Sequence, residues 1–466
     1  MGKIYAFYTM PHPPIIIPEV GRGEEKKIKE TSDACYKVAK EIAHIKPDTI
    51  IIVTPHGPLF RDAVAISAGE NIYGNLSKFG AAQVELNLDI NVPLTEKIIE
   101  YSEKEKILSA EITKSSALQY GIKYELDHGA IVPLYFINKK FLNYKVVHIT
   151  YGMLPKIQLY KFGMCIKKAV EDSNMKAVFI ASGDLSHKLT EDGPYEYSSY
   201  GEKFDKEIIS LLKNGDVLGV FNIDHTTVEE AGECGLRSYY IMLGAMNGYD
   251  MKGNLLAYEG TFGVGYGVMN FSMKESNKDT YNQLIEDKKK RMIQKVESMD
   301  TYVRLARESL THYLMYGEYM DIPDYAKDEI KKCKSGVFVS LKKEGRLRGC
   351  IGTIFPTTEN VATEIIRNAV AAGERDPRFS PVREDELEEL DFSVDVLTEP
   401  QEASREELDP KKYGVIVRSG FKSGLLLPNL EGVDTVKQQL DIALQKGNIS
   451  SDENYMIEKF EVIRHR

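Results

Sequence analysis

The N-terminal half of the chain alternates short apolar runs with helical patterns, and this alternation leaves few folds open. Apolar, β-branched runs such as TIIIVT at 49–54 and KAVFIASG at 176–183 are typical of strands buried on both faces. Helical patterns lie between several of these runs, for example at 159–173 and 200–214. Strands that alternate with helices build layered α/β structures. We therefore predict a largely parallel central sheet flanked by helices.

The second part of the chain follows a different pattern. Segments 336–353 and 413–428 each contain two short strand patterns around a glycine turn, which indicates hairpins. Helical periodicity is present at 359–376 and again at 433–450. We therefore predict an α+β domain with antiparallel hairpins.

A charge-dense segment separates the two patterns. Residues 272–300 are polar and nearly free of β-branched core residues, as expected for a solvated helix. The 466 residues are also too many for one ordinary core. We predict an N-terminal domain at 1–272, a linker helix at 273–296 and a C-terminal domain at 297–466.

Composition excludes several classes of protein. The formal net charge of -10 argues against general nucleic-acid binding, which needs a basic face. No apolar stretch approaches the roughly 20 residues of a transmembrane helix, and the first residues lack the pattern of a signal peptide. Five cysteines, widely spread, do not form a disulfide framework. We expect a cytoplasmic protein that binds neither nucleic acid nor membrane, with a homo-oligomer as the default assembly.

Three histidines each lie just past a predicted strand. They are His12 in TMPHPP, His56 in VTPHGP and His187 in SGDLSH. The carboxyl ends of parallel strands share one edge of the sheet, and ligands usually bind there. We therefore predict that these three histidines converge on one site.

Further candidate ligands lie elsewhere in the same domain. His128 precedes an apolar run, and Glu233 and Cys234 stand in GECG at the start of an apolar helix. Two imidazoles and a carboxylate on one face of a metal are typical of non-haem Fe²⁺ oxygenases, and further histidines would serve as acid and base. The same donors suit zinc, so a zinc hydrolase is a second interpretation. A thiolate at Cys234 would also be a ligand.

The C-terminal domain offers one further candidate. Cys350 follows Arg346 and Arg348 in a glycine-flanked turn, and nearby cations lower the pKa of a thiol. A carboxylate or phosphate between the arginines is one interpretation, because guanidinium groups suit such anions. The alternative is that the glycines only shape a turn and that the charged cluster at 375–378 makes structural ion pairs.

The motifs MPHPP, VTPHGP, LDHGAIVPL and SGDLSH, in this order, resemble those of the LigB-type class III extradiol dioxygenases and their relatives, the Memo proteins. The resemblance spans 3–271. It implies a mononuclear Fe²⁺ site where dioxygenase members open a small catecholic substrate with O₂. It implies His12 and His56 as metal ligands and His187 as acid and base on the substrate hydroxyl. It also implies that His128 helps to hold substrate or oxygen intermediates.

The third ligand distinguishes two groups within this resemblance. In the dioxygenases it is a glutamate near the start of a late helix, which corresponds best to Glu233. Memo-like members present a cysteine there, which corresponds to Cys234, and ring cleavage is not established for them. The first set implies an iron enzyme. The second implies a module that holds copper or iron without opening a ring, and the sequence leaves both open.

The second part of the chain resembles the AMME-syndrome candidate gene product. The motifs RLRGCIGT, ERDPRFSPV, YGVIVRSG and GLLLPNLEGVDTVKQQL carry this resemblance, which covers 297–466. Members of this family are often fused to, or encoded beside, a Memo-like protein and a radical SAM enzyme. The resemblance therefore implies a radical SAM protein as a partner.

Overall fold

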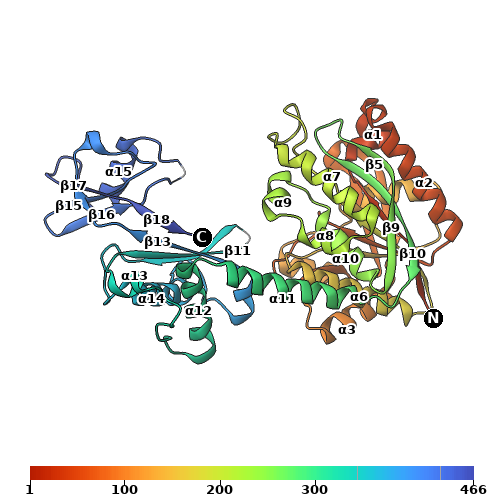
Figure 1. The fold of residues 1–466 in the computed structure, drawn as a ribbon. Helices are drawn as coiled ribbons and strands as arrows, with labels where there is room; N and C mark the ends of the chain where they lie inside the picture. The colour runs from red at the N-terminus through yellow and green to blue at the C-terminus, as the bar shows by residue number, and fades with distance from the viewer. Residues whose placement is uncertain (344, 431) are drawn as a thin grey trace. The chain divides into compact units, whose positions relative to one another are not determined.

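The computed structural model describes residues 1–466 apart from 344 and 431, without the side chains of 292, 293, 295–298, 384, 385 and 388. The chain divides into two compact units, Met1–Lys289 and Lys290–Arg466 (Figure 1). The division falls inside helix α11 (Thr280–Ser298), within the charged segment of the sequence.

The N-terminal unit is built on an eight-stranded sheet with the order β6-β3-β7-β2-β8-β1-β10-β9. Its four central strands, β7, β2, β8 and β1, are parallel, which confirms the largely parallel sheet predicted from the sequence. All six residues of β2 are buried, so its sequence is a continuous apolar run instead of an alternating one. The central strands span Lys145–Thr150 (β7), Thr49–Thr54 (β2), Lys176–Ser182 (β8) and Lys3–Met10 (β1).

Both edges of this sheet depart from the parallel arrangement. Strand β10 (Tyr266–Glu275) runs antiparallel to β1, and β9 (Tyr249–Glu259) runs antiparallel to β10. At the other edge, β3 (Val64–Ser67) is antiparallel to β7 and parallel to β6 (Ser109–Ile112). The parallel centre therefore brings the loops after β1, β2, β7 and β8 to one edge of the sheet.

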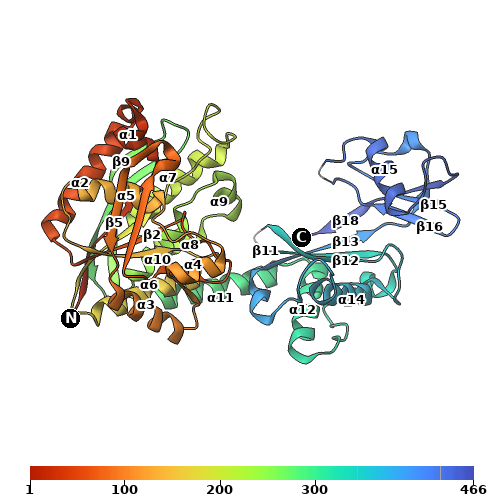
Figure 2. The same ribbon diagram turned by 180° about the vertical axis from the view of Figure 1, so that it is seen from behind.

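Helices cover both faces of the sheet, and each face has its own apolar core (Figure 2). Helices α3 (Val92–Lys104), α6 (Lys156–Glu171) and α10 (Leu236–Ala245) contribute to one core. Helices α2 (Lys29–Ile45) and α5 (His128–Asn138) contribute to the other. Successive side chains of a strand point to opposite faces, so β2 supplies residues to both cores.

Two cysteines lie in the apolar cores of this unit. Cys35 on α2 is 1 % exposed and Cys165 on α6 is 4 % exposed. The shorter elements of this unit include a hairpin, β4–β5, that forms a separate two-stranded sheet. The remaining elements are η1 (Pro14–Ile16), α1 (Pro18–Gly21), η2 (Glu24–Ile28), β4 (Asn71–Leu76), η3 (Ser77–Phe79), β5 (Ala81–Asp89), α4 (Lys114–Tyr120), α7 (Ser199–Asn214), α8 (Val217–Asn222) and α9 (His225–Ala231).

The C-terminal unit contains two four-stranded sheets, β12-β11-β13-β18 and β14-β17-β15-β16, whose recorded pairings are antiparallel. Helices α12 and α14 pack on the first sheet and α15 on the second. This arrangement confirms the predicted α+β domain with hairpins. The elements are α12 (Thr301–Tyr316), α13 (Asp328–Lys332), β11 (Val337–Lys343), β12 (Arg346–Gly352), α14 (Val361–Glu374), η4 (Glu384–Glu389), β13 (Leu390–Leu397), β14 (Gln401–Glu402), η5 (Arg405–Glu407), β15 (Gly414–Ser419), β16 (Lys422–Leu426), α15 (Val436–Lys446), β17 (Met456–Phe460) and β18 (Val462–His465).

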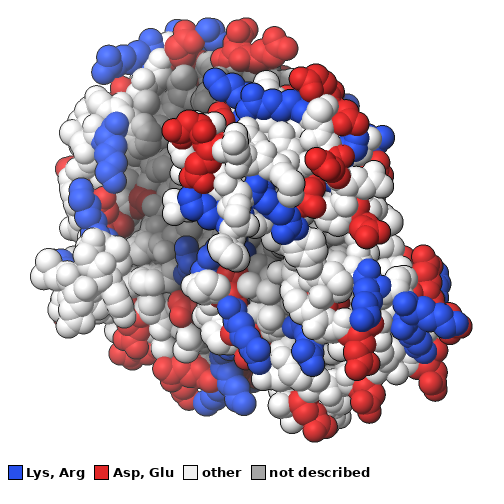
Figure 3. Space-filling view, turned by 90° about the vertical axis from the view of Figure 1, so that its left-hand side faces the viewer, with Lys and Arg blue, Asp and Glu red and all other residues white. Residues whose placement is uncertain are grey.

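The surface carries charges of both signs. Acidic and basic side chains are interspersed over the face drawn in Figure 3. Among the described residues, no helix has both the length and the apolar composition needed to cross a membrane.

Candidate metal centre

Three histidines meet at the carboxyl edge of the parallel strands. His12 follows β1, His56 follows β2, and His128 is the first residue of α5. Each offers one ring nitrogen, and these nitrogens all lie within 4.8 Å of one another. The Nε2 atoms of His12 and His56 are 2.9 Å apart, and the rings of His56 and His128 stack with centroids 4.2 Å apart. The sequence placed His12, His56 and His187 at this edge, and the structure groups His12 and His56 with His128 instead of His187.

Hydrogen bonding identifies the free nitrogen of His12. The Ser182 hydroxyl donates to the carbonyl oxygen of Gly129 at 2.5 Å. That hydroxyl therefore accepts a hydrogen bond from the N–H at Nδ1 of His12, which lies 2.9 Å away. Nε2 of His12 is left unprotonated and faces the cluster. A ligand histidine usually has its other nitrogen held in this way.

The donor set fits a transition metal ion. Metal–nitrogen bonds of about 2.0–2.1 Å, meeting near a right angle, would separate two ligand nitrogens by roughly 3 Å. The 2.9 Å between Nε2 of His12 and Nε2 of His56 matches that separation. Imidazole nitrogen suits zinc, copper, iron and nickel. The residues present can therefore hold a metal, and their geometry does not identify which one.

The environment keeps the site histidines neutral. Burial lowers the pKa of His12 well below its ordinary value, and His56, His128 and His187 lower it further. Burial also lowers the pKa of His56, although Asp127 acts in the opposite direction. The pKa values of His128 and His187 fall to about 4, first through burial and then through His56. Neutral imidazole is the form that binds metals.

His187 lies beside the cluster, in the loop after β8. Its backbone N–H donates to the carbonyl oxygen of Ala231 at 3.1 Å, which fixes the loop. Its ring stacks on Tyr195 with centroids 5.3 Å apart. His187 is close enough to affect the pKa of His12, but it does not belong to the three-histidine group among the described residues.

The two candidates for a third ligand are placed differently. The sulfur of Cys234 lies 3.6 Å from Nε2 of His12, and the side chain is buried. The Glu233 carboxylate accepts the backbone N–H of Leu236 at 2.6 Å, in the first turn of α10. Burial raises the pKa of Glu233 to about 7. Cys234 therefore contacts the cluster, whereas Glu233 is hydrogen-bonded to the start of a helix.

Asp184 is a polar neighbour of the cluster that the sequence analysis missed. Its carboxylate accepts the backbone N–H of His12 at 2.8 Å, and its second oxygen lies 3.9 Å from Nε2 of His12. Its own backbone N–H lies 3.3 Å from the sulfur of Cys234. Burial raises the pKa of Asp184 to about 7. The sequence did contain a signal for Asp184, because this residue stands in SGDLSH just after β8, at the strand end where ligands usually bind.

A second missed group, Asp127, connects three strands to α5. Its carboxylate accepts the Thr54 hydroxyl at 2.6 Å and pairs with Nε2 of His148 at 3.0 Å. The other nitrogen of His148 lies 2.9 Å from the Ser67 hydroxyl. Asp127 is the N-cap residue of α5, yet its side chain makes no cap bond. The network therefore ties the end of β2, just before His56, to the residue just before His128.

The same network accounts for His148, a buried histidine inside strand β7. Both of its ring nitrogens have partners, and it is 2 % exposed. Burial acts to raise the pKa of Asp127, but the hydrogen bonds from His148 and Thr54 and the electrostatic effects of His148 and His128 together lower it. Asp127 is thus held as a carboxylate.

In the C-terminal unit, two arginines near Cys350 are engaged by carboxylates. Arg348 binds both oxygens of Glu386, at 2.9 and 3.2 Å, and Arg378 binds Asp376 at 2.6 Å. The backbone N–H of Cys350 donates to Asp376 at 2.8 Å. These contacts favour the structural interpretation of the charged cluster over an anion site. Cys350 remains partly exposed, with the Ser340 hydroxyl 3.2 Å from its sulfur.

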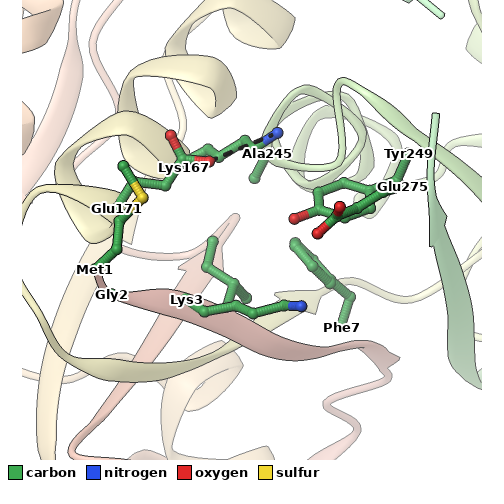
Figure 4. Close-up of a pocket in the computed structure, with 10 residues that line it drawn as sticks. Met1, Gly2, Lys3, Phe7, Lys167, Glu171, Ala245, Tyr249 and Glu275 are labelled. Carbon is green, nitrogen blue, oxygen red and sulfur yellow. Dashed lines mark ion pairs between the residues drawn. The ribbon is translucent and has the colours of Figure 1, made fainter. Parts of the chain in front are cut away.

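A small cavity of about 210 Å³ lies at the opposite, amino end of β1 (Figure 4). Its charged lining is partly paired, since Lys167 lies 3.8 Å from Glu171 and 4.5 Å from the centre of the Tyr249 ring. The three histidines follow the carboxyl end of β1, so this cavity is separate from them. Figure 4 labels the lining residues Met1, Gly2, Lys3, Phe7, Lys167, Glu171, Ala245, Tyr249 and Glu275.

Comparison with known proteins gives two family matches. Residues 6–269 match the catalytic LigB subunit of aromatic ring-opening dioxygenase, and residues 303–465 match AMMECR1. A protein of Clostridium acetobutylicum is 57 % identical over 465 residues, which covers 100 % of this chain and 99 % of the relative. A protein of Thermotoga maritima is 46 % identical over 168 residues, 35 % of this chain and 97 % of the relative.

Two solved structures also resemble parts of the chain. A protein of Pyrococcus horikoshii has 31 % identity and a TM-score of 0.32, and the match covers 35 % of this chain and 88 % of that one. A protein of Escherichia coli K12 has 11 % identity and a TM-score of 0.39, and the match covers 57 % of this chain and 98 % of that one.

Proposed function

Because the chain belongs to the family of the catalytic LigB subunit of aromatic ring-opening dioxygenases and carries an AMMECR1 domain after it, we propose that it is a non-haem Fe²⁺ ring-cleavage enzyme. Its substrates would be a small catecholic compound and O₂. The observation that carries the proposal is the 2.9 Å approach of Nε2 of His12 to Nε2 of His56, with His12 in the tautomer that a metal ligand needs.

Iron bound by His12 and His56 would supply a Lewis acid for the two substrate oxygens and a source of electrons for O₂. His187, neutral because its pKa is about 4, would accept a proton from a substrate hydroxyl at a ring nitrogen. His128, stacked on His56, would help to hold the substrate. Ser182 and Asp127 would keep the ligand side chains and their loops in place.

A second candidate function is supported by the 3.6 Å contact between Cys234 and His12. With Cys234 as third ligand, the domain would be a Memo-like module that holds copper or iron and opens no ring. A soft thiolate suits Cu⁺ better than a carboxylate does. Such a module would work with a radical SAM protein. With Glu233 as third ligand, its carboxylate would first have to leave the N–H of Leu236.

Metal analysis separates the two functions. Protein purified without oxygen would be assayed for iron, copper and zinc, and its spectrum recorded before and after addition of catechol. Near-stoichiometric iron whose spectrum changes with catechol supports ring cleavage. Copper or zinc with no response to catechol contradicts it and favours the second function.

Two variants test the third ligand directly. Loss of metal from Glu233→Ala but not from Cys234→Ala would support the dioxygenase ligand set. Loss only from Cys234→Ala would support the Memo-like set. Thermal unfolding of both variants provides the control, because a variant that has lost its fold would lose metal for an unrelated reason.

A further inference from the structure

An exposed phenylalanine lies against one of the site histidines. Phe79 belongs to η3, in the connection between β4 and β5, and is 38 % exposed. Its ring centroid lies 5.1 Å from that of His128, at an interplanar angle of 60°. His128 in turn stacks on His56, the exposed member of the cluster.

An exposed tyrosine lies against another site histidine. Tyr195, in the loop between β8 and α7, is 54 % exposed, and its ring is nearly parallel to that of His187 at 5.3 Å. His56 lowers the pKa of both His187 and His128, so the two pairs of rings lie close to the same residue. Phe79 and Tyr195 therefore approach the centre through different histidines and from segments far apart in the sequence.

Folding does not account for either ring. Neither Phe79 nor Tyr195 belongs to any apolar cluster formed by the described residues. Single exposed aromatic residues are common on protein surfaces. Here, however, each exposed ring contacts an imidazole of the candidate site, and His56, the most exposed member of the histidine group, interacts with both of those imidazoles. Aromatic rings in this position provide apolar faces on which a flat ring can stack.

We propose that Phe79 and Tyr195 are specificity-determining residues that form two aromatic walls at the opening of the metal site and select a planar aromatic ligand. This inference rests on the proposed function, because it concerns the substrate of the same site. The walls would contact the carbon ring of the ligand, while the oxygens of the ligand face the metal held by His12 and His56. For a ligand with the same chelating oxygens but no ring, the two aromatic walls would not increase the binding affinity.

The test compares two chelating probes on iron-loaded protein without oxygen. 4-Nitrocatechol has an aromatic ring, whereas acetohydroxamate chelates through two oxygens without one. We expect Phe79→Ala and Tyr195→Ala each to raise the Kd for 4-nitrocatechol about fivefold to tenfold and to leave the Kd for acetohydroxamate within about twofold. Tyr195→Phe should bind like the wild type, because the ring is kept.

A control variant and the iron content make the result specific. Tyr197→Ala removes a similarly exposed ring from the same loop, with no contact to a site histidine recorded among the described residues, and should change neither Kd. Iron content should stay at the wild-type level in all four variants. An equal loss of affinity for both probes would overturn the inference, since the rings would then only hold the histidines. Unchanged affinity for 4-nitrocatechol would also overturn it.

The inference and the proposed function can fail separately. Wild-type protein that binds 4-nitrocatechol through the walls but does not cleave catechol in air would overturn ring cleavage and leave the walls standing. Cleavage of catechol by Phe79→Ala and Tyr195→Ala with wild-type KM would overturn the walls and leave ring cleavage standing. A wild type that contains iron and binds no 4-nitrocatechol would overturn both.

Discussion

The two units of this chain use their polar side chains in opposite ways. In the N-terminal unit, His12 and His56 bring two basic ring nitrogens to 2.9 Å from each other. In the C-terminal unit, Arg348 is paired with Glu386. Opposite charges in contact satisfy each other, whereas two neutral imidazole nitrogens in contact share a single proton, whose place a metal ion bound by both nitrogens could take. Convergent donors of one kind therefore indicate a binding site more clearly than a dense cluster of mixed charges.

The largest effect should come from removing a ligand. His56→Ala should reduce bound iron by more than about 100-fold, since even the groups behind ligands contribute 10–100-fold to metal affinity. Stability should change little without metal, because His56 is exposed. Metal analysis of protein purified without oxygen provides the measurement. If His56→Ala bound as much iron as the wild type, the histidine cluster of the N-terminal unit would not be a metal site, and the contrast with the paired charges of the C-terminal unit would fail.

The network behind the ligands should have the next largest effect. Asp127→Asn keeps an acceptor for one partner but removes the charge that pairs with His148, so metal affinity should fall by about 10–100-fold. Titration of the metal-free protein with Fe²⁺ measures this change. Glu125→Gln, two residues away in a surface pair with Lys78, is the matched control and should bind iron normally. Equal binding by both variants would show that the network only supports the fold.

Removal of one partner of an ion pair in the C-terminal unit should not change the metal content of the protein. Arg348→Met leaves the partly buried Glu386 carboxylate without its partner, which should cost about 2–3 kcal/mol of stability. Iron content should not change. Denaturant unfolding monitored beside iron analysis checks both statements, and the double change with Glu386→Leu should recover part of the loss. Loss of iron from Arg348→Met would contradict the independence of the two regions.

The smallest predicted effect concerns pH. Burial raises the pKa of Asp205 to about 6, above its ordinary value of 3.8, so the folded protein holds this proton more tightly than the unfolded chain does. The stability that the protonated carboxyl contributes should therefore be lost as the pH rises from about 4 to about 6, by about 2 kcal/mol. Asp205→Asn should lack this slope when unfolding is measured at pH 4, 5, 6 and 7. If the free energy of unfolding depended on pH equally in the wild type and in Asp205→Asn, the assignment of this pH dependence to Asp205 would be wrong.

Asp376 should give the opposite slope in the other unit. The hydrogen bond from Arg378 lowers the pKa of Asp376 below its ordinary value. Its contribution to stability is therefore present above the ordinary pKa and is lost as the pH falls below it. Unfolding of the wild type and of Asp376→Asn, with the pH series extended down to about pH 2, checks this sign because the slope lies below the ordinary pKa of 3.8. The two substitutions should change the pH dependence of the free energy of unfolding in opposite directions. If Asp205→Asn and Asp376→Asn changed it in the same direction relative to the wild type, the predicted difference between the two carboxyl groups would be wrong.

Local sequence patterns predicted the central elements well and failed where the pattern was uniform or short. Strand β2 was predictable because a strand buried on both faces is a continuous apolar run. Helix α5 was not predicted, since all of Gly129–Ile137 is buried and the helix has no polar face to mark its period. The β4–β5 hairpin was missed as well, and it carries the η3 segment with Phe79.

By itself, the sequence determined the parallel centre of the sheet, the α+β character of the second unit and the position of His12 and His56 at strand ends. These features depend on residues close together in the chain and on one rule of topology, that parallel strands end at a common edge. Only the tertiary structure decided that His128, and not His187, groups with these two, that Cys234 contacts His12, and that the Glu233 carboxylate accepts a hydrogen bond from Leu236. These contacts depend on side-chain directions set by packing, which no local pattern records.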